Sequence, residues 1–362
     1  MTPFDSYMLI STNPGRGTNF EMRGELMLPG TSGTKTLTLT RRDADVVAEK
    51  PTTNMFANSW TGPLHIGAFD GDDFTGCEAT FYLFNAGSKQ DSIRAEEAGK
   101  KDQAGQWTTL SVSAVKGDKK LQQVLPPMQA FLVVATGEVG SEGDHMIILD
   151  YKKHVYDPAL DSIENGTEKE IPIVPVRAPK RTLATEEPEI MRFFVEGESG
   201  RADHMYMYLR DDFTENFDNC WDGRKITGGA FTPQLFAVTN DGWMALNAIP
   251  DAEGTVVGFR AGTEDNSYTF TFEYEGADIW YLNDLEAQTS TMIENEGSYS
   301  FTATEGNTYS HRFIISATPI SHMPTGFDNV NDGSKARKLM IDGTLYIIRS
   351  GRMYNAEGTL VK

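Results

Sequence analysis

Apolar residues in this chain come in short runs of four to seven residues, each bounded by Gly, Asp, Asn or Pro. Examples are Ala79–Phe84, Ala130–Val134, Met205–Leu209 and Tyr268–Tyr274. Runs of this length with turn residues on both sides are typical of β-strands. In the second half they recur about every ten residues, which is the spacing of sandwiches and jelly rolls. The sequence therefore predicts an all-β fold of two jelly-roll-like β-sandwich domains and a short C-terminal β-hairpin module.

Two breaks in this pattern divide the chain, whose 362 residues are enough for two or three separate cores. The stretch from Lys152 to Pro188 holds five prolines and many charges but little periodicity, which is typical of an extended linker. A second break, rich in Gly, Asn and Asp, runs from Pro319 to Asp332. We therefore expect a β-sandwich module at residues 1–155, a linker at 156–187, a second β-sandwich module at 188–318 and a C-terminal tail at 333–362.

The charge balance narrows the choice of partners. The 52 acidic residues outnumber the 32 basic ones and give an isoelectric point near 4.7, so the chain lacks the positive charge that binding to nucleic acid requires. No apolar run approaches the roughly 20 residues that span a bilayer. The N-terminus, which begins Met1–Thr2–Pro3–Phe4, lacks the basic and apolar regions of a signal peptide. If the protein is exported, we expect its export signal to lie upstream and this chain to be a fragment.

No motif in the sequence indicates catalysis. The chain lacks the G-x-S-x-G, H-E-x-x-H, P-loop and dinucleotide-binding patterns, and its six histidines are scattered singly, which disfavours a zinc site. Cys77 and Cys220 are the two cysteines, and buried free thiols are a better interpretation of them than an interdomain disulfide. The sequence therefore predicts a protein that is not an enzyme and has no cofactor.

Two acidic loops make Ca²⁺ binding a candidate function of this chain. Asp218 and Asp222 lie in the segment DDFTENFDNCWDG, and Asp328 and Asp332 lie in the segment DNVNDG. Clustered carboxylates suit Ca²⁺, but the first segment lacks the D-x-[DN]-x-[DN]-G spacing and Val330 breaks it in the second. Solvated turns whose side chains bond their own backbone are the favoured interpretation, and Ca²⁺ binding is the alternative.

Carbohydrate binding is a second candidate function, and it depends on the tryptophan residues. We single out Trp221 and Trp243 as candidate platforms for sugar rings, because aromatic faces stack on pyranoses and β-sandwiches commonly carry carbohydrate. Singly placed aromatic residues in β proteins are more often half-buried parts of the core. Core packing is therefore the favoured interpretation, and sugar stacking is the alternative.

The last residues of the chain, from Lys335 to Lys362, form a distinct segment. Leu345–Ile348 is an apolar run between two Gly-containing turns, and Met353 with Tyr354 opens a second strand. The segment holds six Lys and Arg residues against Asp342 and Glu357, a formal charge of +4 in a chain whose total is -20. A small basic β module on an acidic β protein indicates a separately recognised tail.

This tail resembles the C-terminal module of many secreted and surface proteins of Bacteroidetes. Their pattern is roughly K-hydrophobic-x-D/N-G-x-hydrophobic-Y-I-x-R-x-G-x-x-Y-x-x-x-G-x-hydrophobic. The matching residues are Lys338, Asp342, Gly343, Tyr346, Ile347, Arg349, Gly351, Tyr354 and Gly358. The resemblance implies a sorting or anchoring address that secretion or cell-surface attachment machinery recognises through these residues.

The rest of the chain resembles a pair of β modules common in large surface proteins of the same phylum. In the first half the resemblance rests on the blocks Asn54 to Ile66, Asp73 with Phe74, Ala79 to Ser88 and Leu125 to Phe131. In the second half it rests on the blocks Phe217 to Lys225, Pro233 to Val238 and Trp280 to Asp284. Such modules usually follow repeats, adhesive regions or enzymes, so the resemblance implies a noncatalytic region.

These observations together predict a noncatalytic structural or adhesion-type region of an exported bacterial protein, located at the cell surface or outside the cell. The tail is its expected secretion or attachment signal. Glycans or host surface proteins are the expected ligands of such an adhesin. The alternative is a carbohydrate-binding module of a polysaccharide-degrading surface protein, with Trp221 or Trp243 on an exposed face and Ca²⁺ held by an Asp loop.

Overall fold

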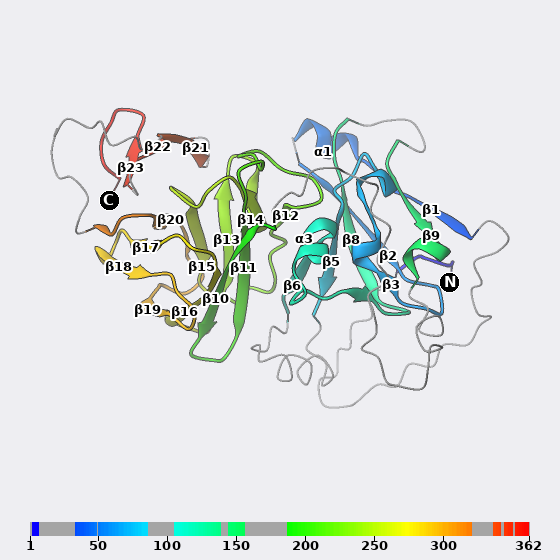
Figure 1. Ribbon diagram of the computed structural model, residues 1–362, viewed down its shortest axis with the longest axis horizontal. Coiled ribbons are helices and arrows are strands. Elements are labelled where there is room, and N and C mark those ends of the chain that lie inside the picture. Colours follow the sequence, from blue (N-terminus) through cyan, green and yellow to red (C-terminus); the bar gives the residue numbers. More distant parts are fainter. Residues whose placement is uncertain are drawn as a thin grey trace. The chain divides into compact units, whose positions relative to one another are not determined.

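The computed structural model describes residues 2–6, 33–48, 50–85, 105–138, 144–155, 187–320, 336–341, 344–349 and 352–361. Strands make up most of the regular structure in these residues, which confirms the all-β prediction (Figure 1). The chain forms two units: Met1–Leu83 with Leu110–Thr185, and Phe84–Thr109 with Glu186–Lys362. Apart from Glu187, the predicted linker at 156–187 lies outside the described residues.

Short elements make up the first unit. Its strands are β1 (Thr34–Thr38), β2 (Thr52–Ala57), β3 (Leu64–His65), β4 (Phe74–Thr75), β5 (Thr80–Phe84), β6 (Trp107–Ser111), β7 (Val124–Leu125), β8 (Ala130–Ala135) and β9 (Met146–Asp150). Its helices are α1 (Asp43–Val47), α3 (Val112–Gly117) and α4 (Tyr151–His154), with 3-10 turns η1 (Ile66–Ala68) and η2 (Gly71–Asp73). The sheets have the orders β2-β8-β5-β6, β1-β9-β4 and β3-β7. Because the division between the units falls after Leu83 and after Thr109, it passes through β5 and β6.

Aromatic side chains fill the core of the first unit. The Phe81 ring lies 5.2 Å from that of Phe69 and 5.3 Å from that of Phe131, both edge-on. The imidazole of His154, which is fully buried, stacks on Phe69 at 3.7 Å. Edge-on ring pairs of this kind add to the free energy gained by burying apolar area.

The second unit holds longer strands. They are β10 (Glu189–Gly197), β11 (Ala202–Leu209), β12 (Gly223–Arg224), β13 (Gln234–Thr239), β14 (Gly242–Ile249), β15 (Val256–Arg260), β16 (Ser267–Glu275), β17 (Tyr281–Asp284), β18 (Thr289–Met292), β19 (Ser298–Thr302) and β20 (Thr308–Ser316). Their order is β18-β17-β20-β15-β13-β14-β11-β10-β16-β19, with β12 paired to β14. Among these described strands only β11 and β14 pair in parallel.

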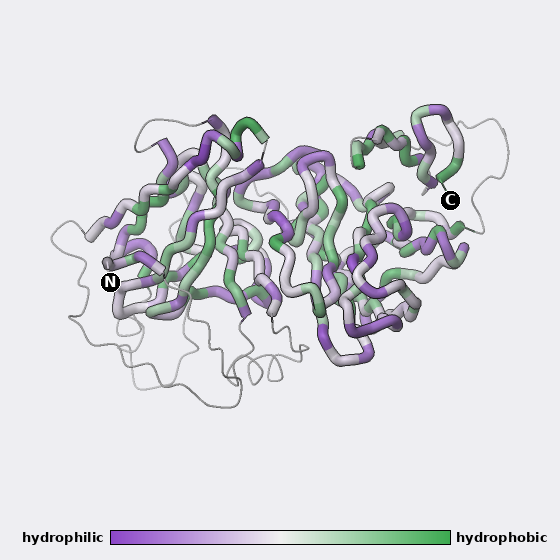
Figure 2. Tube along the Cα trace, turned by 180° about the vertical axis from the view of Figure 1, so that it is seen from behind, coloured by the Kyte–Doolittle hydropathy of each residue, from purple (hydrophilic) through white to green (hydrophobic). Residues whose placement is uncertain are grey.

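This sheet curls until its two ends meet. Its terminal strands are β18 and β19, and the Tyr299 hydroxyl of β19 lies 3.2 Å from Oγ1 of Thr289 in β18. The interior is lined by alternate residues of each strand, as in β16, where Phe270 and Phe272 point inward and Thr271 is exposed. Figure 2 shows apolar residues along the strands and polar residues at many of the turns.

Three neighbouring strands of the curled sheet are apolar on both faces. In β13, Leu235 and Ala237 belong to the interior core, whereas Phe236 and Val238 belong to a second apolar cluster on the opposite face. The same alternation holds in β15 and β20, where Val256 and Ile314 belong to the second cluster. The sequence of a strand that is buried on both faces is a nearly continuous apolar run. The sequences of these three strands have this pattern.

Candidate functional site

The tail forms a three-stranded antiparallel sheet. Its strands are β21 (Arg337–Ile341), β22 (Thr344–Arg349) and β23 (Arg352–Asn355), in the order β21-β22-β23. The sequence predicted β22 and β23, and the structure adds β21, in which buried Leu339 and Ile341 alternate with exposed Lys338 and Met340. Three residues of the predicted signal pattern, Asp342, Gly343 and Gly351, lie outside the described residues.

The inner face of the tail sheet covers the second apolar cluster of the curled sheet. Its contributors are Leu339, Ile341, Ile348 and Met353, each buried, and they pack against Phe236, Val238, Val256 and Ile314. This contact explains why three strands of the curled sheet carry apolar residues on the side away from the interior core. We call this contact the tail seat.

Two further contacts fix the tail sheet on its seat. The backbone N–H of Met340 donates to Oδ1 of Asn240 at 3.0 Å, which places β21 beside the turn between β13 and β14. The ring of Tyr346 lies 4.8 Å from the imidazole of His311 in β20. Tyr346, one of the predicted signal residues, therefore has a packing role within this chain.

Other predicted signal residues lie on the outer face of the tail sheet. Lys338, Ile347 and Tyr354 stand opposite one another across the three strands, and the period of two places them away from buried Leu339, Ile348 and Met353. Lys338 is exposed, and Ile347 and Tyr354 are half-buried. Arg349 and Arg352 form the next cross-strand pair on the same face. The outer face is therefore mixed apolar and basic.

A tight turn closes the tail. Oδ1 of Asn355 accepts the backbone N–H groups of Glu357 at 3.1 Å and Thr359 at 2.8 Å. Gly358 has a φ of 79°, a left-handed conformation that glycine adopts without a steric penalty. The glycine that matches the Bacteroidetes pattern here therefore serves the geometry of the turn.

Both candidate tryptophans pack against other aromatic rings. Trp243 stacks on Phe236 at 4.0 Å and lies against the tail seat. Trp221 lies 5.0 Å from the ring of Phe213, and the guanidinium of Arg210 lies 5.1 Å from the Trp221 ring. Each indole is half-buried. Sugar stacking on these residues stays a prediction.

The first acidic loop uses its carboxylates to order its own backbone. Asp222 is buried and accepts the backbone N–H groups of Ala248 at 2.6 Å and Asp218 at 2.7 Å. Burial raises the pKa of the Asp222 carboxyl to about 7. Asp218 in turn accepts the backbone N–H of Thr214 at 2.7 Å. Asp328 and Asp332 lie outside the described residues. Among the residues that the structure describes, no group of three or more His, Cys, Asp or Glu side chains could hold a metal ion.

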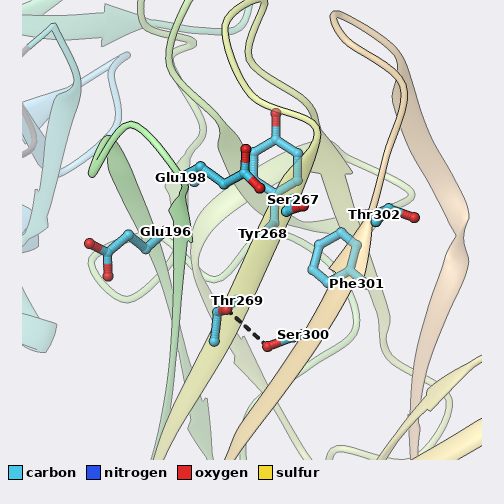
Figure 3. A pocket seen from close by; sticks show the side chains of 9 residues that line it. Glu196, Glu198, Ser267, Tyr268, Thr269, Ser300, Phe301 and Thr302 are labelled. Carbon is cyan, nitrogen blue, oxygen red and sulfur yellow. Dashed lines mark hydrogen bonds between the residues drawn. The ribbon is translucent and has the colours of Figure 1, made fainter.

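A pocket of about 370 Å³ opens where β10, β16 and β19 come together (Figure 3). It is lined by Glu196, Gly197, Glu198, Ser267, Tyr268, Thr269, Ser300, Phe301 and Thr302. Oγ1 of Thr269 and Oγ of Ser300 are 3.0 Å apart. The Tyr268 hydroxyl donates to the backbone oxygen of Asp265 at 2.7 Å, and burial raises its pKa to about 12. The pocket thus offers hydroxyl and carboxylate groups over two buried rings. Sequence reasoning missed it because its residues come from three separate strands and from the turn that follows β10.

The fold and the seated tail define an all-β chain whose second unit is a curled sheet with a small basic sheet packed on one face. No family model and no solved structure matches this chain. It is similar to the minor fimbrium subunit Mfa5 of Porphyromonas gingivalis, with 25% identity over 315 residues that cover 85% of this chain. The matched region is 24% of that relative, so this chain spans about a quarter of its length. None of the helices in the described residues has the length and apolar content that crossing a membrane needs.

Proposed function

We propose that this chain is a noncatalytic structural or adhesion-type region of an exported bacterial surface protein, and that its tail is the secretion or attachment signal. The similarity to a fimbrium subunit of a Bacteroidetes species carries this proposal. That relative is by name a subunit of a minor fimbrium, and the similarity runs through most of this chain. The proposed role needs neither catalysis nor a cofactor.

The two faces of the tail sheet support the recognition role. Its inner face seats the sheet on the second unit through Leu339, Ile348 and Met353. Its outer face presents Lys338 and Tyr354, which the seat does not use. A folded module that turns basic and aromatic groups away from the protein suits recognition by an acidic partner surface, because complementary charge favours and orients the encounter. The secretion or attachment machinery is the proposed partner.

The test uses the full-length protein that contains this chain, produced in the bacterium that encodes it. The outer-face variant combines Lys338→Glu with Tyr354→Ala, and the control Lys152→Glu reverses an exposed charge in the first unit. We expect the outer-face variant to be made at normal levels but to lose antibody access on intact cells, and the control to be displayed. Normal display of the outer-face variant and of a chain without Lys335–Lys362 would contradict the proposal.

Carbohydrate binding is the second candidate, and the pocket between β10, β16 and β19 favours it. Sugar hydroxyls bond well to carboxylates and hydroxyls such as those of Glu198, Thr269 and Ser300. Retardation of the purified chain in gels that contain a soluble polysaccharide measures such binding. We expect Thr269→Val to weaken retardation, and the exposed control Thr271→Val, on the same strand β16 but outside the pocket lining, to leave it unchanged. No retardation by a panel of polysaccharides would exclude this function for the pocket.

A further inference from the structure

Lys225 and Asp203 form an ion pair inside the second unit. Nζ of Lys225 donates to Oδ2 of Asp203, and both side chains are only 1% exposed. Among the ion pairs of the described residues, this is the pair whose two side chains are both the least exposed to solvent. Lys153 with Asp73, for comparison, leaves 30% of the lysine side chain in solvent. Removing two charges from water costs free energy that the attraction between them often fails to recover.

The local structure holds both groups at one end of the interior core. Asp203 lies in β11 on the same face as Met205 and Met207, which belong to that core. Lys225 follows β12, and its backbone N–H donates to the Trp243 oxygen at 2.8 Å. The two residues are therefore on separate segments, 22 positions apart in the chain, and each is fixed by backbone pairing.

The two oxygens of the Asp203 carboxyl have different surroundings. Oδ2 accepts the Lys225 ammonium and also the backbone N–H of Leu235 at 2.6 Å. Oδ1 is buried and no group among the described residues makes a well-formed hydrogen bond to it, although the backbone N–H of His204 also acts to lower the pKa of this carboxyl. An unpartnered buried oxygen is costly, so the carboxyl as it stands is poorly accommodated. A well-formed bond from a backbone N–H to one oxygen, with no such bond to the other, suits an acyl group that keeps the first oxygen and loses the second.

We propose that Lys225 and Asp203 condense to an intramolecular amide bond. The ammonium of Lys225 gives a proton to the carboxylate, and the proton comes to lie on Oδ1, which leaves a neutral amine and a neutral carboxylic acid. The Nζ lone pair then attacks Cγ, so that a C–N bond forms and negative charge develops on Oδ2, where the Leu235 N–H donates. The C–Oδ1 bond breaks, and Oδ1 leaves as water with one proton from the carboxylic acid and one from the amine. No oxidant, reductant or second substrate is required.

The environment favours each stage of this step. A low-dielectric core disfavours charge, and burial raises the pKa of the Asp203 carboxyl even though Lys225 opposes the change. A neutral lysine amine is a nucleophile, whereas the ammonium is not. The amide removes both buried charges and the unpartnered oxygen, and its carbonyl keeps the bond from Leu235. The product would tie β11 to the segment after β12 covalently and would survive denaturation.

The test is the mass of the purified full-length chain under denaturing, reducing conditions. We expect a mass lower than that of the sequence by one water molecule, and a tryptic map in which the Asp203 peptide is joined to a peptide left uncut at Lys225. The full sequence mass, with separate linear peptides for both residues, would overturn the proposal. So would a water loss that maps to an Asp-Gly sequence such as Asp222–Gly223, because succinimide formation there gives the same mass change.

Lys225→Arg is the decisive variant, since arginine keeps the charge but is not a nucleophile for this step. We expect it to have its full sequence mass. Lys153→Arg, at the solvated pair of the first unit, is the matched control and should keep the water loss. Persistence of the loss in Lys225→Arg would refute the assignment to this pair. If Lys225→Arg does not fold, the mass and peptide map of the unaltered protein still decide the question.

Discussion

Asp222 illustrates, for a single side chain, the conflict between burial and hydrogen bonding in this fold. The carboxyl is 3% exposed, and two backbone N–H groups donate to it. Those donors favour the charged form, but removal from water favours the neutral form and has the larger effect. The pKa is therefore raised from 3.8 to about 7. The loop that holds Asp222 keeps its geometry at the cost of a carboxyl that resists ionisation.

This shift makes the stability of the second unit depend on pH. Because the folded-state pKa exceeds the unfolded value, the folded protein binds more protons between about pH 4 and pH 7. The free energy of unfolding therefore decreases as the pH rises through this window, by at most about 4 kcal/mol from this group. We expect Asp222→Asn to reduce the difference between urea unfolding at pH 5 and at pH 8.

The control for this prediction is Asp211→Asn, which alters an exposed carboxyl in the same loop. We expect Asp211→Asn to keep the pH dependence of the unaltered chain. Asp222→Asn also loses one acceptor, since its amide nitrogen replaces an oxygen that now accepts an N–H, so its absolute stability is lower. The comparison therefore rests on the change between the two pH values. An equal change in Asp222→Asn and the unaltered chain would show that burial does not control this carboxyl.

The tail sheet has one buried face and one exposed face. Substitution of one methionine on each face tests this division. Met353 is fully buried in the tail seat, whereas Met340 is 47% exposed on the outer face. Truncation of a buried methionine costs about 2–5 kcal/mol, and an exposed substitution changes stability by about 0.5 kcal/mol or less. We expect Met353→Ala to speed amide exchange in β21, β22 and β23, and Met340→Ala to leave it nearly unchanged. Equal effects would place the seat elsewhere.

The strands were predictable from the sequence wherever turn residues bounded an apolar run. The run Leu345–Ile348 lies inside β22, and the run Gln234–Val238 lies inside β13. The use of each face was not predictable, because β13 is apolar at successive positions and local pattern alone does not say what covers Phe236. The answer lies a hundred residues further along the chain, in the tail. Only long-range packing relates the two segments.

The candidate sites were also only partly predictable, because local sequence pattern does not identify partners that are distant in the chain. Asp203 is one of 52 acidic residues, and no local pattern pairs it with Lys225. The signal that was present is an acidic residue in a strand of mostly apolar and aromatic residues, Ala202–Leu209, since such a residue needs a partner when it is buried. The identity of that partner depends on the pairing of β11 and β12 with β14. For the tail, the pattern located the segment, and only the structure separated Tyr346 at the seat from Lys338 and Tyr354 outside.

At the scale of the whole molecule, the second unit has two cores that depend on the tail to different degrees. The interior core contains no residue from the tail, whereas half of the second cluster comes from Leu339, Ile341, Ile348 and Met353. Without the tail, the curled sheet keeps the core that closes it but presents an uncovered apolar face. A contiguous patch of this kind promotes association between copies.

Deletion of Lys335–Lys362 is therefore expected to leave the second unit folded but prone to self-association. Phe236, Val238 and Ile314 would become exposed together. We expect the shortened chain to bind an apolar dye and to elute from a sizing column as oligomers, while its circular dichroism keeps the β signature. Adding Val238→Thr and Ile314→Thr to the shortened chain should reduce dye binding and return its elution volume toward that of the unaltered chain, since both side chains face the tail and not the interior core. A monomeric, dye-silent shortened chain would show that the tail does not shield this face in solution.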